Sequence, residues 1–78
     1  MVSKDKFLAI FEEVLEATSG SIKGQELLDS LDNWGSLAVL SLIAKAYEDL
    51  GVSLVPKQVT SAKTVDDLYH LVQEKTKS

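Results

Sequence analysis

The segment from Ser36 to Leu50 constrains the fold of this chain more than any other. Two adjoining apolar stripes run along it with helical spacing, one formed by Leu37, Leu40, Ala44 and Tyr47 and the other by Val39, Leu42, Ile43, Ala46 and Leu50. Apolar residues thus cover most of the circumference, which is typical of a helix buried centrally in a small bundle. Gly51 is expected to end this helix.

Helical periodicity also predicts a first helix from Lys4 to Ala17. Ser3 is its expected N-cap, and Gly20 is expected to be the left-handed terminator of the segment. The apolar stripe of this helix consists of Phe7, Ile10, Phe11, Val14, Leu15 and Thr18. The acidic residues Glu12, Glu13 and Glu16 lie largely outside that stripe.

Two more helices are predicted in the C-terminal part of the chain. Pro56 starts a short helix from Lys57 to Ser61. Thr64 and Asp67 have the spacing of a capping box, which opens a last helix that reaches about Glu74. The apolar stripe of this last helix consists of Val65, Leu68, Tyr69 and Val72.

A long connection from Ser21 to Gly35 joins the first and second main helices. We expect Leu27, Leu28 and Leu31 to pack against the core and to hold this connection in place. We also expect a short helical turn around Gln25 to Leu28. Long loops in compact domains are often functional. The predicted fold class is therefore all-α: a small four-helix bundle, with three main helices and one short helix, and a long loop between the first and second helices.

Composition excludes several classes of function. The chain has 78 residues, no cysteine, one histidine and a formal net charge of −4, which fits a single domain over residues 1–78. A chain without cysteine forms no disulfide and no thiolate metal site, and His70 alone cannot build a histidine metal cluster. All 8 basic residues are lysines, and an acidic chain without arginine is a poor candidate for binding nucleic acid.

The sequence also suggests where the protein acts. No apolar run approaches the ~20 residues that a membrane span requires. The segment from Met1 to Lys6 leads into an amphipathic helix rather than a secretion signal. We therefore expect a cytoplasmic, monomeric protein without membrane insertion, whose acidic surface suits partners that carry basic patches.

Ser36 is the candidate functional residue, because it lies where the long loop turns into the apolar helix. A serine at this position can cap the helix with its side-chain oxygen. Alternatively, it can present an exposed hydroxyl at the positive end of the helix dipole. Ser30 and Ser41 are the competing serines, and both are expected to be structural.

Three segments carry a resemblance to a known family: Gly35-Ser36-Leu37, Tyr47 to Val52 and Lys63 to Leu68. With the order of the helices, they make nearly the whole chain resemble an acyl carrier protein. The resemblance implies that Ser36 accepts 4′-phosphopantetheine from coenzyme A, and that the thiol of this arm carries acyl groups as thioesters. It also implies a carrier rather than an enzyme, with no catalytic or metal-binding residues. The implied partners are a phosphopantetheinyl transferase and enzymes of acyl loading and acyl transfer.

Gly35 departs from the family's pattern, because the residue before the serine is usually aspartate in the family. That aspartate helps the transferase to engage the carrier, and Asp32 and Asn33 are the nearest residues that could substitute for it in part. Glycine is tolerated at an N-cap, so the fold should be unaffected.

The second helix departs as well, since Ala38, Ser41 and Tyr47 occupy positions where acids are common in the family. These departures indicate a specialised carrier, for example of a lipid, polyketide or surface-glycan pathway. Tyr47 itself could be a core residue or an exposed partner contact. The expected partner-binding residues are Trp34, Gly35, Leu37, Glu48 and Asp49. Trp34 can also serve as an aromatic lid over the helix end.

Three alternatives stay open. A peptidyl or aminoacyl carrier has a similar serine and a similar helix plan. A helical protein-interaction module without a prosthetic group is favoured by Gly35. A small hydrolase using Ser36 is disfavoured, because His70 is the only histidine and no His–acid pair accompanies it.

Overall fold

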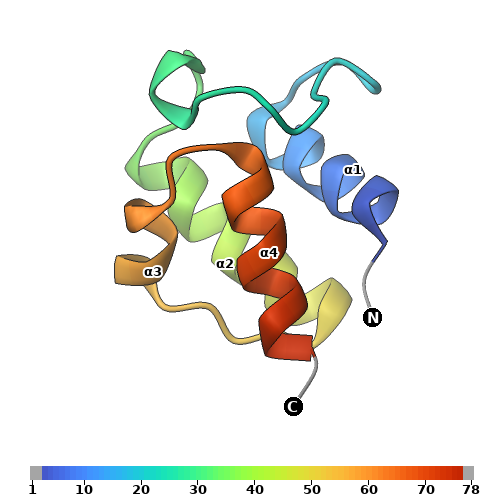
Figure 1. The fold of residues 1–78 in the computed structure, drawn as a ribbon, viewed down its shortest axis with the longest axis vertical. Helices are drawn as coiled ribbons and strands as arrows, with labels where there is room; N and C mark the ends of the chain where they lie inside the picture. The colour runs from blue at the N-terminus through green and yellow to red at the C-terminus, as the bar shows by residue number, and fades with distance from the viewer. Residues whose placement is uncertain (1–2, 77–78) are drawn as a thin grey trace.

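A computed structural model describes residues 3–76, which form four α-helices and one 3₁₀ turn (Figure 1). The elements are α1 (Lys4–Leu15), η1 (Leu28–Ser30), α2 (Ser36–Leu50), α3 (Pro56–Ser61) and α4 (Val65–Thr76). The all-α prediction, with one short helix and a long loop between the first two main helices, is confirmed. In the part of the chain described here, no helix combines the length and the apolar character needed to cross a membrane.

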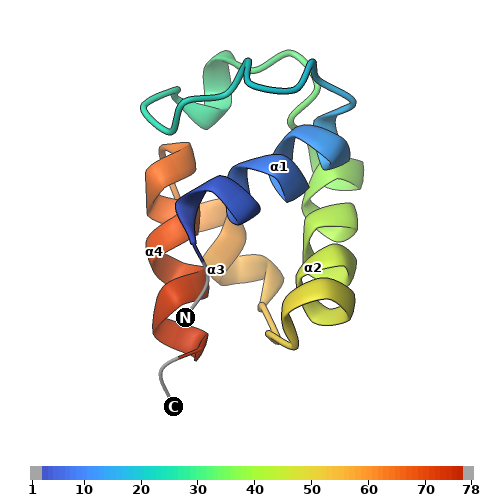
Figure 2. The same cartoon turned by 90° about the vertical axis from the view of Figure 1, so that its right-hand side faces the viewer.

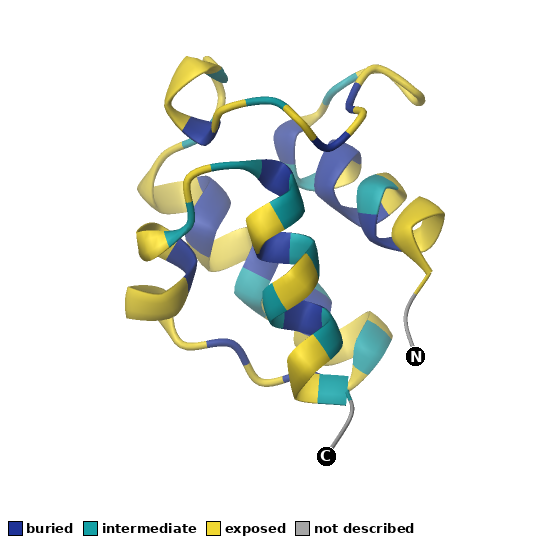
Figure 3. Ribbon diagram, viewed as in Figure 1, coloured by how far each residue is buried: buried dark blue, intermediate teal, exposed yellow. Residues whose placement is uncertain are grey.

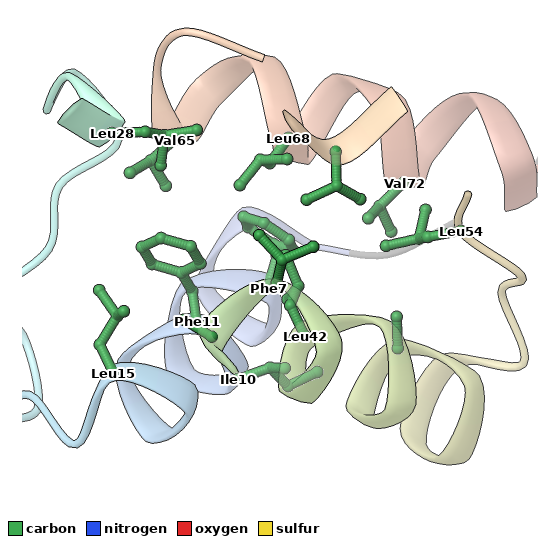
Figure 4. Packing of buried hydrophobic residues seen from close by; sticks show 14 of the residues in the cluster. Phe7, Ile10, Phe11, Leu15, Leu28, Leu42, Leu54, Val65, Leu68 and Val72 are labelled. Atoms are coloured by element: carbon green, nitrogen blue, oxygen red, sulfur yellow. The ribbon is translucent and has the colours of Figure 1, made fainter. Parts of the chain in front are cut away.

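The helices α2 and α4 run in the same direction, α1 crosses them, and the long loop passes over the end of the bundle where α2 and α4 begin (Figures 1 and 2). Phe7 and Phe11 project from α1 toward the centre, near Leu42 of α2 and Leu68 of α4 (Figure 4). All four side chains are fully buried. The apolar stripe of α1 therefore forms the middle of the core, as its spacing predicts.

The helix α1 ends earlier than its sequence predicts. Glu16, and not Gly20, adopts the terminating left-handed conformation, with φ at 56°. The backbone N–H of Glu16 donates to the carbonyl of Glu13, and Ala17 N–H donates to the carbonyl of Glu12. Gly20 also has a positive φ, of 85°, but it lies in the loop beyond the helix. The expected helix end at Ala17 and the expected terminator are thus both wrong, because a non-glycine residue takes the left-handed position.

Glu12 holds the start of the loop against α1. Periodicity places it outside the apolar stripe, yet only 6% of it is exposed. Its Oε2 accepts hydrogen bonds from the backbone N–H of Gly20 (2.9 Å) and of Ile22 (3.0 Å). The returning chain covers the carboxylate and supplies its partners, which satisfies the rule that buried polar groups are hydrogen-bonded.

The middle of the loop is tied to the connection between α3 and α4. The N–H of Leu28 donates to the carbonyl of Lys63 (2.8 Å), and the N–H of Val65 donates to the carbonyl of Glu26 (3.1 Å). Leu27 forms an isolated β-bridge with Thr64. These bonds fix the path of this part of the loop, although it forms only an isolated bridge and no strand.

Two predictions about this loop are corrected by its path. The helical turn lies at Leu28–Ser30 rather than around Gln25 to Leu28. Leu28 is buried and Leu31 is half-buried, as expected, but 57% of Leu27 is exposed. Because backbone pairing fixes Leu27, its side chain is free to face the solvent.

The capping box of α4 is confirmed. The N–H of Asp67 donates to Thr64 Oγ1, and the N–H of Thr64 donates back to Asp67 Oδ2, each at 3.2 Å. The N–H of Lys63 donates to the same carboxylate oxygen. The hydrogen bonds from the backbone N–H groups of Lys63 and Thr64 lower the pKa of Asp67 below its ordinary value, and the bond from Lys63 has the larger effect. The helix α4 extends to Thr76, two residues beyond the expected end at Glu74.

The prediction that α2 is a central, buried helix is wrong. Its buried residues are Ala38, Val39, Leu42 and Ala46, all on one side. The other predicted stripe faces the solvent, with Leu37 81% exposed, Leu40 59% exposed and Tyr47 65% exposed. Figure 3 shows buried residues gathered between the helices and exposed residues on the outside. The helix therefore lies at the edge of the bundle, and no described element covers its outer side.

The Glu12 contacts lead to a stability prediction. The substitution Glu12→Ala should lower the free energy of unfolding by about 1–3 kcal/mol, because it leaves the N–H groups of Gly20 and Ile22 without an acceptor. The glutamine side chain has the same length as glutamate and keeps one acceptor oxygen. Glu12→Gln should therefore lower the free energy of unfolding less than Glu12→Ala does. Urea denaturation followed by circular dichroism measures both. Equal stability of the wild type and Glu12→Ala would contradict this role of the carboxylate.

Candidate functional site: a serine beside an apolar groove

Ser36 is the first residue of α2, and its side chain is exposed. The N-cap is Gly35, with φ −170° and ψ −165°, and no side chain caps this helix end. Since the cap position is already taken by Gly35, the hydroxyl of Ser36 does not serve as the N-cap. Of the two uses that the sequence leaves open, the structure therefore excludes N-capping and leaves the hydroxyl accessible.

A groove with a volume of about 530 Å³ adjoins Ser36. It lies between the end of the long loop, the first turns of α2, and α3, and its lining residues are Asp29, Trp34, Gly35, Ser36, Val39, Leu40, Pro56 and Thr60. The side chains of Trp34, Val39, Leu40 and Pro56 make it partly apolar. Its size falls within the range of ordinary ligand sites, about 300–1,000 Å³.

Trp34 connects the groove to the core. Its ring lies 5.5 Å from the ring of Phe11, centroid to centroid, at an interplanar angle of 38°. The side chain is half-buried and also lines the groove. The two roles that the sequence suggests for Trp34, a lid and a contact with a bound group, are therefore compatible at one position.

The loop before Ser36 is anchored by Asn33, whose Nδ2 donates to the backbone carbonyl of Leu15 at 2.8 Å. This bond turns the amide of Asn33 toward the end of α1. Asp32 is exposed and does not line the groove, whereas Asp29 does. Asp29 is the only carboxylate among the described residues that line this groove. Sequence reasoning missed it, because only the observed position of the 3₁₀ turn brings residue 29 close to residue 36.

Two opposing charges act on an anion at Ser36: the N-terminus of α2 attracts it, whereas the Asp29 carboxylate of the same groove repels it. The first turn of an α-helix has backbone N–H groups without partners inside the helix, and the helix dipole adds partial positive charge there. The first turn of α2 contains no acidic residue that would offset this charge. The N-terminus of α2 would stabilise an anion attached at Ser36 by roughly 0.3–1 kcal/mol.

The two expected acidic docking residues on α2 differ in their surroundings. Asp49 Oδ2 lies 3.8 Å from Lys45 Nζ, and the same ammonium lies 2.7 Å from Glu13 Oε1 on α1. The hydrogen bond to Glu13 raises the pKa of Lys45. Glu48 is exposed, next to Tyr47. Asp49 is therefore partly neutralised within the molecule, whereas Glu48 faces the solvent.

The remaining candidate residues lie away from the groove. His70 lines a separate hollow between α3 and α4, together with Asp67 and Glu74, so Ser36 and His70 do not form a pair. Ser30 donates its hydroxyl to the carbonyl of Leu27 at 2.7 Å, which fits the structural role expected for it. In residues 3–76, no three His, Asp or Glu side chains are placed to hold a metal ion.

Comparisons of this chain with protein-family models, with curated proteins and with solved structures find no match. The site consists of an exposed serine at a helix N-terminus, a partly apolar groove beside it, and a tryptophan that joins the groove to the core.

The position of Gly35 leads to a prediction with a matched control. A Cβ atom at Gly35 would meet no atom within 4 Å, and its extended backbone suits any residue. Gly35→Asp should therefore fold normally and raise the free energy of unfolding by roughly a few tenths of a kcal/mol, since aspartate is a better N-cap.

The control is Gly51→Asp, at the other end of the same helix. A Cβ atom there also meets open space, but φ is +67°. Gly51→Asp should therefore lower the free energy of unfolding by about 1–2 kcal/mol. Thermal and urea unfolding of the two variants measure the difference. Equal destabilisation by both would show that backbone conformation does not decide the effect.

Proposed function

We propose that this protein is an acyl carrier protein, which holds acyl intermediates as thioesters on a 4′-phosphopantetheine arm attached to Ser36. One observation carries the proposal: an exposed serine hydroxyl at the first residue of α2, outside the cap position, beside a partly apolar groove.

The residues around Ser36 fit the proposed arm. Its phosphate would lie at the N-terminus of α2, where the helix dipole and free N–H groups stabilise negative charge. Trp34, Leu40 and Pro56 would contact its apolar portions, and Thr60 would supply a polar contact. The arm supplies the thiol that forms the thioester, so a chain without cysteine can take part in this chemistry.

The protein itself would position the arm rather than break bonds. The inner side of α2 is fixed by Val39, Leu42 and Ala46 in the core. Asn33 fixes the preceding loop through the carbonyl of Leu15. A rigid base for Ser36 would present the arm to a phosphopantetheinyl transferase, and then to acyl-loading and acyl-transfer enzymes, in one orientation.

A specialised pathway of lipid, polyketide or surface-glycan synthesis fits the weak acidity of α2. On its outer side only Glu48 is an acid without a pairing lysine, since Asp49 lies near Lys45. A peptidyl or aminoacyl carrier would use the same serine and the same arm, and its cargo distinguishes it. The setting we propose for all of these carriers is cytoplasmic.

The second candidate is a helical interaction module without an arm. Gly35 favours it, because this position lacks the aspartate that acyl carrier proteins usually have. The exposed apolar residues of α2 also suit a binding protein. The two candidates differ in whether Ser36 is modified.

The mass of the intact protein tests the proposal. After incubation with coenzyme A, magnesium and a broad-specificity phosphopantetheinyl transferase, the wild type should gain the mass of one phosphopantetheine. Ser36→Ala should gain none and should keep its helix content by circular dichroism, because Ser36 is exposed and is not the N-cap. Modification of Ser36→Ala would show that the site is wrong.

Gly35→Asp provides the companion measurement. It restores the acid that precedes the serine in acyl carrier proteins, so it should be primed faster than the wild type by the same transferase. Priming of Gly35→Asp alone would place the deficiency of the wild type at this residue. Failure of the folded wild type and of folded Gly35→Asp to gain mass would favour the module without an arm.

A further inference from the structure

The first part of the long loop is held to the molecule mainly by carboxylates. Residues 19–24 are here called the lid. Four backbone N–H groups of the lid donate to carboxylate oxygens, those of Gly20, Ile22, Lys23 and Gly24. Glu12 on α1 accepts the first two bonds, at 2.9 and 3.0 Å, and Glu26 of the loop accepts the other two, at 2.8 and 2.7 Å. Since hydrogen bonds to ionised groups are about twice as strong as neutral ones, the charge on these two glutamates decides how firmly the lid is held.

Apolar packing contributes less to holding the lid. Ile22 is the only lid residue in the hydrophobic core, and the other lid residues except Gly24 are exposed. One backbone bond joins the lid to α4, in which the N–H of Asp66 donates to the carbonyl of Gly24 at 2.8 Å. Segments with few buried apolar contacts open at a lower free-energy cost than the core does. The lid is therefore a part of the chain that can open before the helices unfold.

A hollow of about 460 Å³ lies between the lid and α1. Leu8 and Ala9 of α1 and Ile22 of the lid are its apolar lining residues. The backbone bonds between Glu12 and the lid close the hollow on one side. Movement of the lid away from α1 would expose this apolar surface to water.

Charged groups of both signs surround the two glutamates. Lys4 and Asp5 on α1 and Lys23 on the lid line the hollow, to which Glu12 also belongs. On α4, Asp66 Oδ1 lies 3.0 Å from Lys4 Nζ. In acid, the carboxylates lose their charge whereas both lysines keep theirs. Protonation thus leaves a positive charge on the lid and another on α1, and like charges repel.

The direction of the pH effect follows from Glu26. Burial raises the pKa of this carboxyl, but the hydrogen bonds from the backbone N–H groups of Lys23, Gly24 and Glu26 itself outweigh burial and place the pKa below its ordinary value. The stabilisation of the lid by Glu26 is therefore complete above the ordinary pKa of a glutamate. It is lost as the pH falls through the lowered pKa, so the lid is closed at neutral pH.

The part of the loop beyond the lid is held by groups that do not titrate in acid. Leu28 is buried, and its N–H donates to the carbonyl of Lys63. The amide of Asn33 donates to the carbonyl of Leu15. Neither bond involves an acid. The segment that enters Ser36 therefore keeps its anchors when the lid loses its own.

We propose that the lid is an acid-released latch on α1: protonation of Glu12 and Glu26 frees residues 19–24, while the helices and the Ser36 corner stay folded. The released lid uncovers Ile22 and the hollow beneath it. This device does not depend on any modification of Ser36, so it stands or falls separately from the carrier function.

Amide hydrogen exchange of the ¹⁵N-labelled protein tests the latch between about pH 7 and pH 3. After correction for the intrinsic exchange rate, the four lid amides that donate to carboxylates should lose protection by about tenfold or more as the pH falls. The amides of Leu42 and Leu68 in the core should keep theirs. The fluorescence of Trp34, the only tryptophan, reports the Ser36 corner and should stay constant over the same range.

Neutral variants separate the latch from general effects of acid. The double variant Glu12→Gln/Glu26→Gln keeps one acceptor oxygen on each side chain but removes the charge. At neutral pH, its lid amides should already be about tenfold less protected than those of the wild type and should no longer respond to pH. The matched control is Asp67→Asn, which neutralises a carboxylate that accepts two N–H groups outside the lid. It should leave lid protection within about twofold.

Three results would overturn the latch. Loss of protection by lid and core amides at the same pH would mean that the lid opens only with the whole bundle. Wild-type protection of the lid in Glu12→Gln/Glu26→Gln would mean that the carboxylates do not hold it. An equal loss of lid protection in Asp67→Asn would mean that the effect is not specific to Glu12 and Glu26.

Discussion

The packing of Phe7 and Phe11 in the centre of the bundle determines the rest of this structure. Their ring centroids lie 6.1 Å apart, and each ring also contacts another aromatic residue: Phe7 contacts Tyr69 on α4, and Phe11 contacts Trp34 beside the groove. Burying each phenylalanine contributes roughly 1.5–3 kcal/mol. A continuous series of rings therefore extends from α4 through α1 to the wall of the Ser36 groove, and the position of the site depends on the same packing that stabilises the fold.

A long loop between α1 and α2 can position a site only if its backbone polar groups find partners. In this protein the partners lie on α1 and at the connection that leads into α4. Glu12 accepts from the N–H groups of Gly20 and Ile22, Asn33 donates to the end of α1, and the loop exchanges backbone bonds with the connection before α4. These contacts join three parts of the chain that are distant in sequence, so the segment entering Ser36 has a defined path.

The sequence predicts those features that depend on local chemistry. The bounds of α2 and the Thr64–Asp67 capping box follow from periodicity, from glycine at the helix end and from cap spacing, and both agree with the structure. The burial of Glu12 could not be predicted in this way, because it arises where the chain returns over α1. The left-handed Glu16 also escaped prediction, since glycine is the residue that local sterics favour there. For the candidate site, the sequence identifies Ser36 and Trp34, whereas Asp29 joins them only through the tertiary path of the loop.

The most informative error concerns α2, because periodicity detects that residues are apolar and not what covers them. Both stripes of the helix have the composition of a core, but only the side with Val39, Leu42 and Ala46 is buried. That buried side fixes the rotation of the helix about its own axis. Since Ser36, Leu40 and Tyr47 share the opposite face, fixing the rotation turns the serine and these two side chains outward together. The contacts that stabilise the bundle thus set where a group on Ser36 would lie.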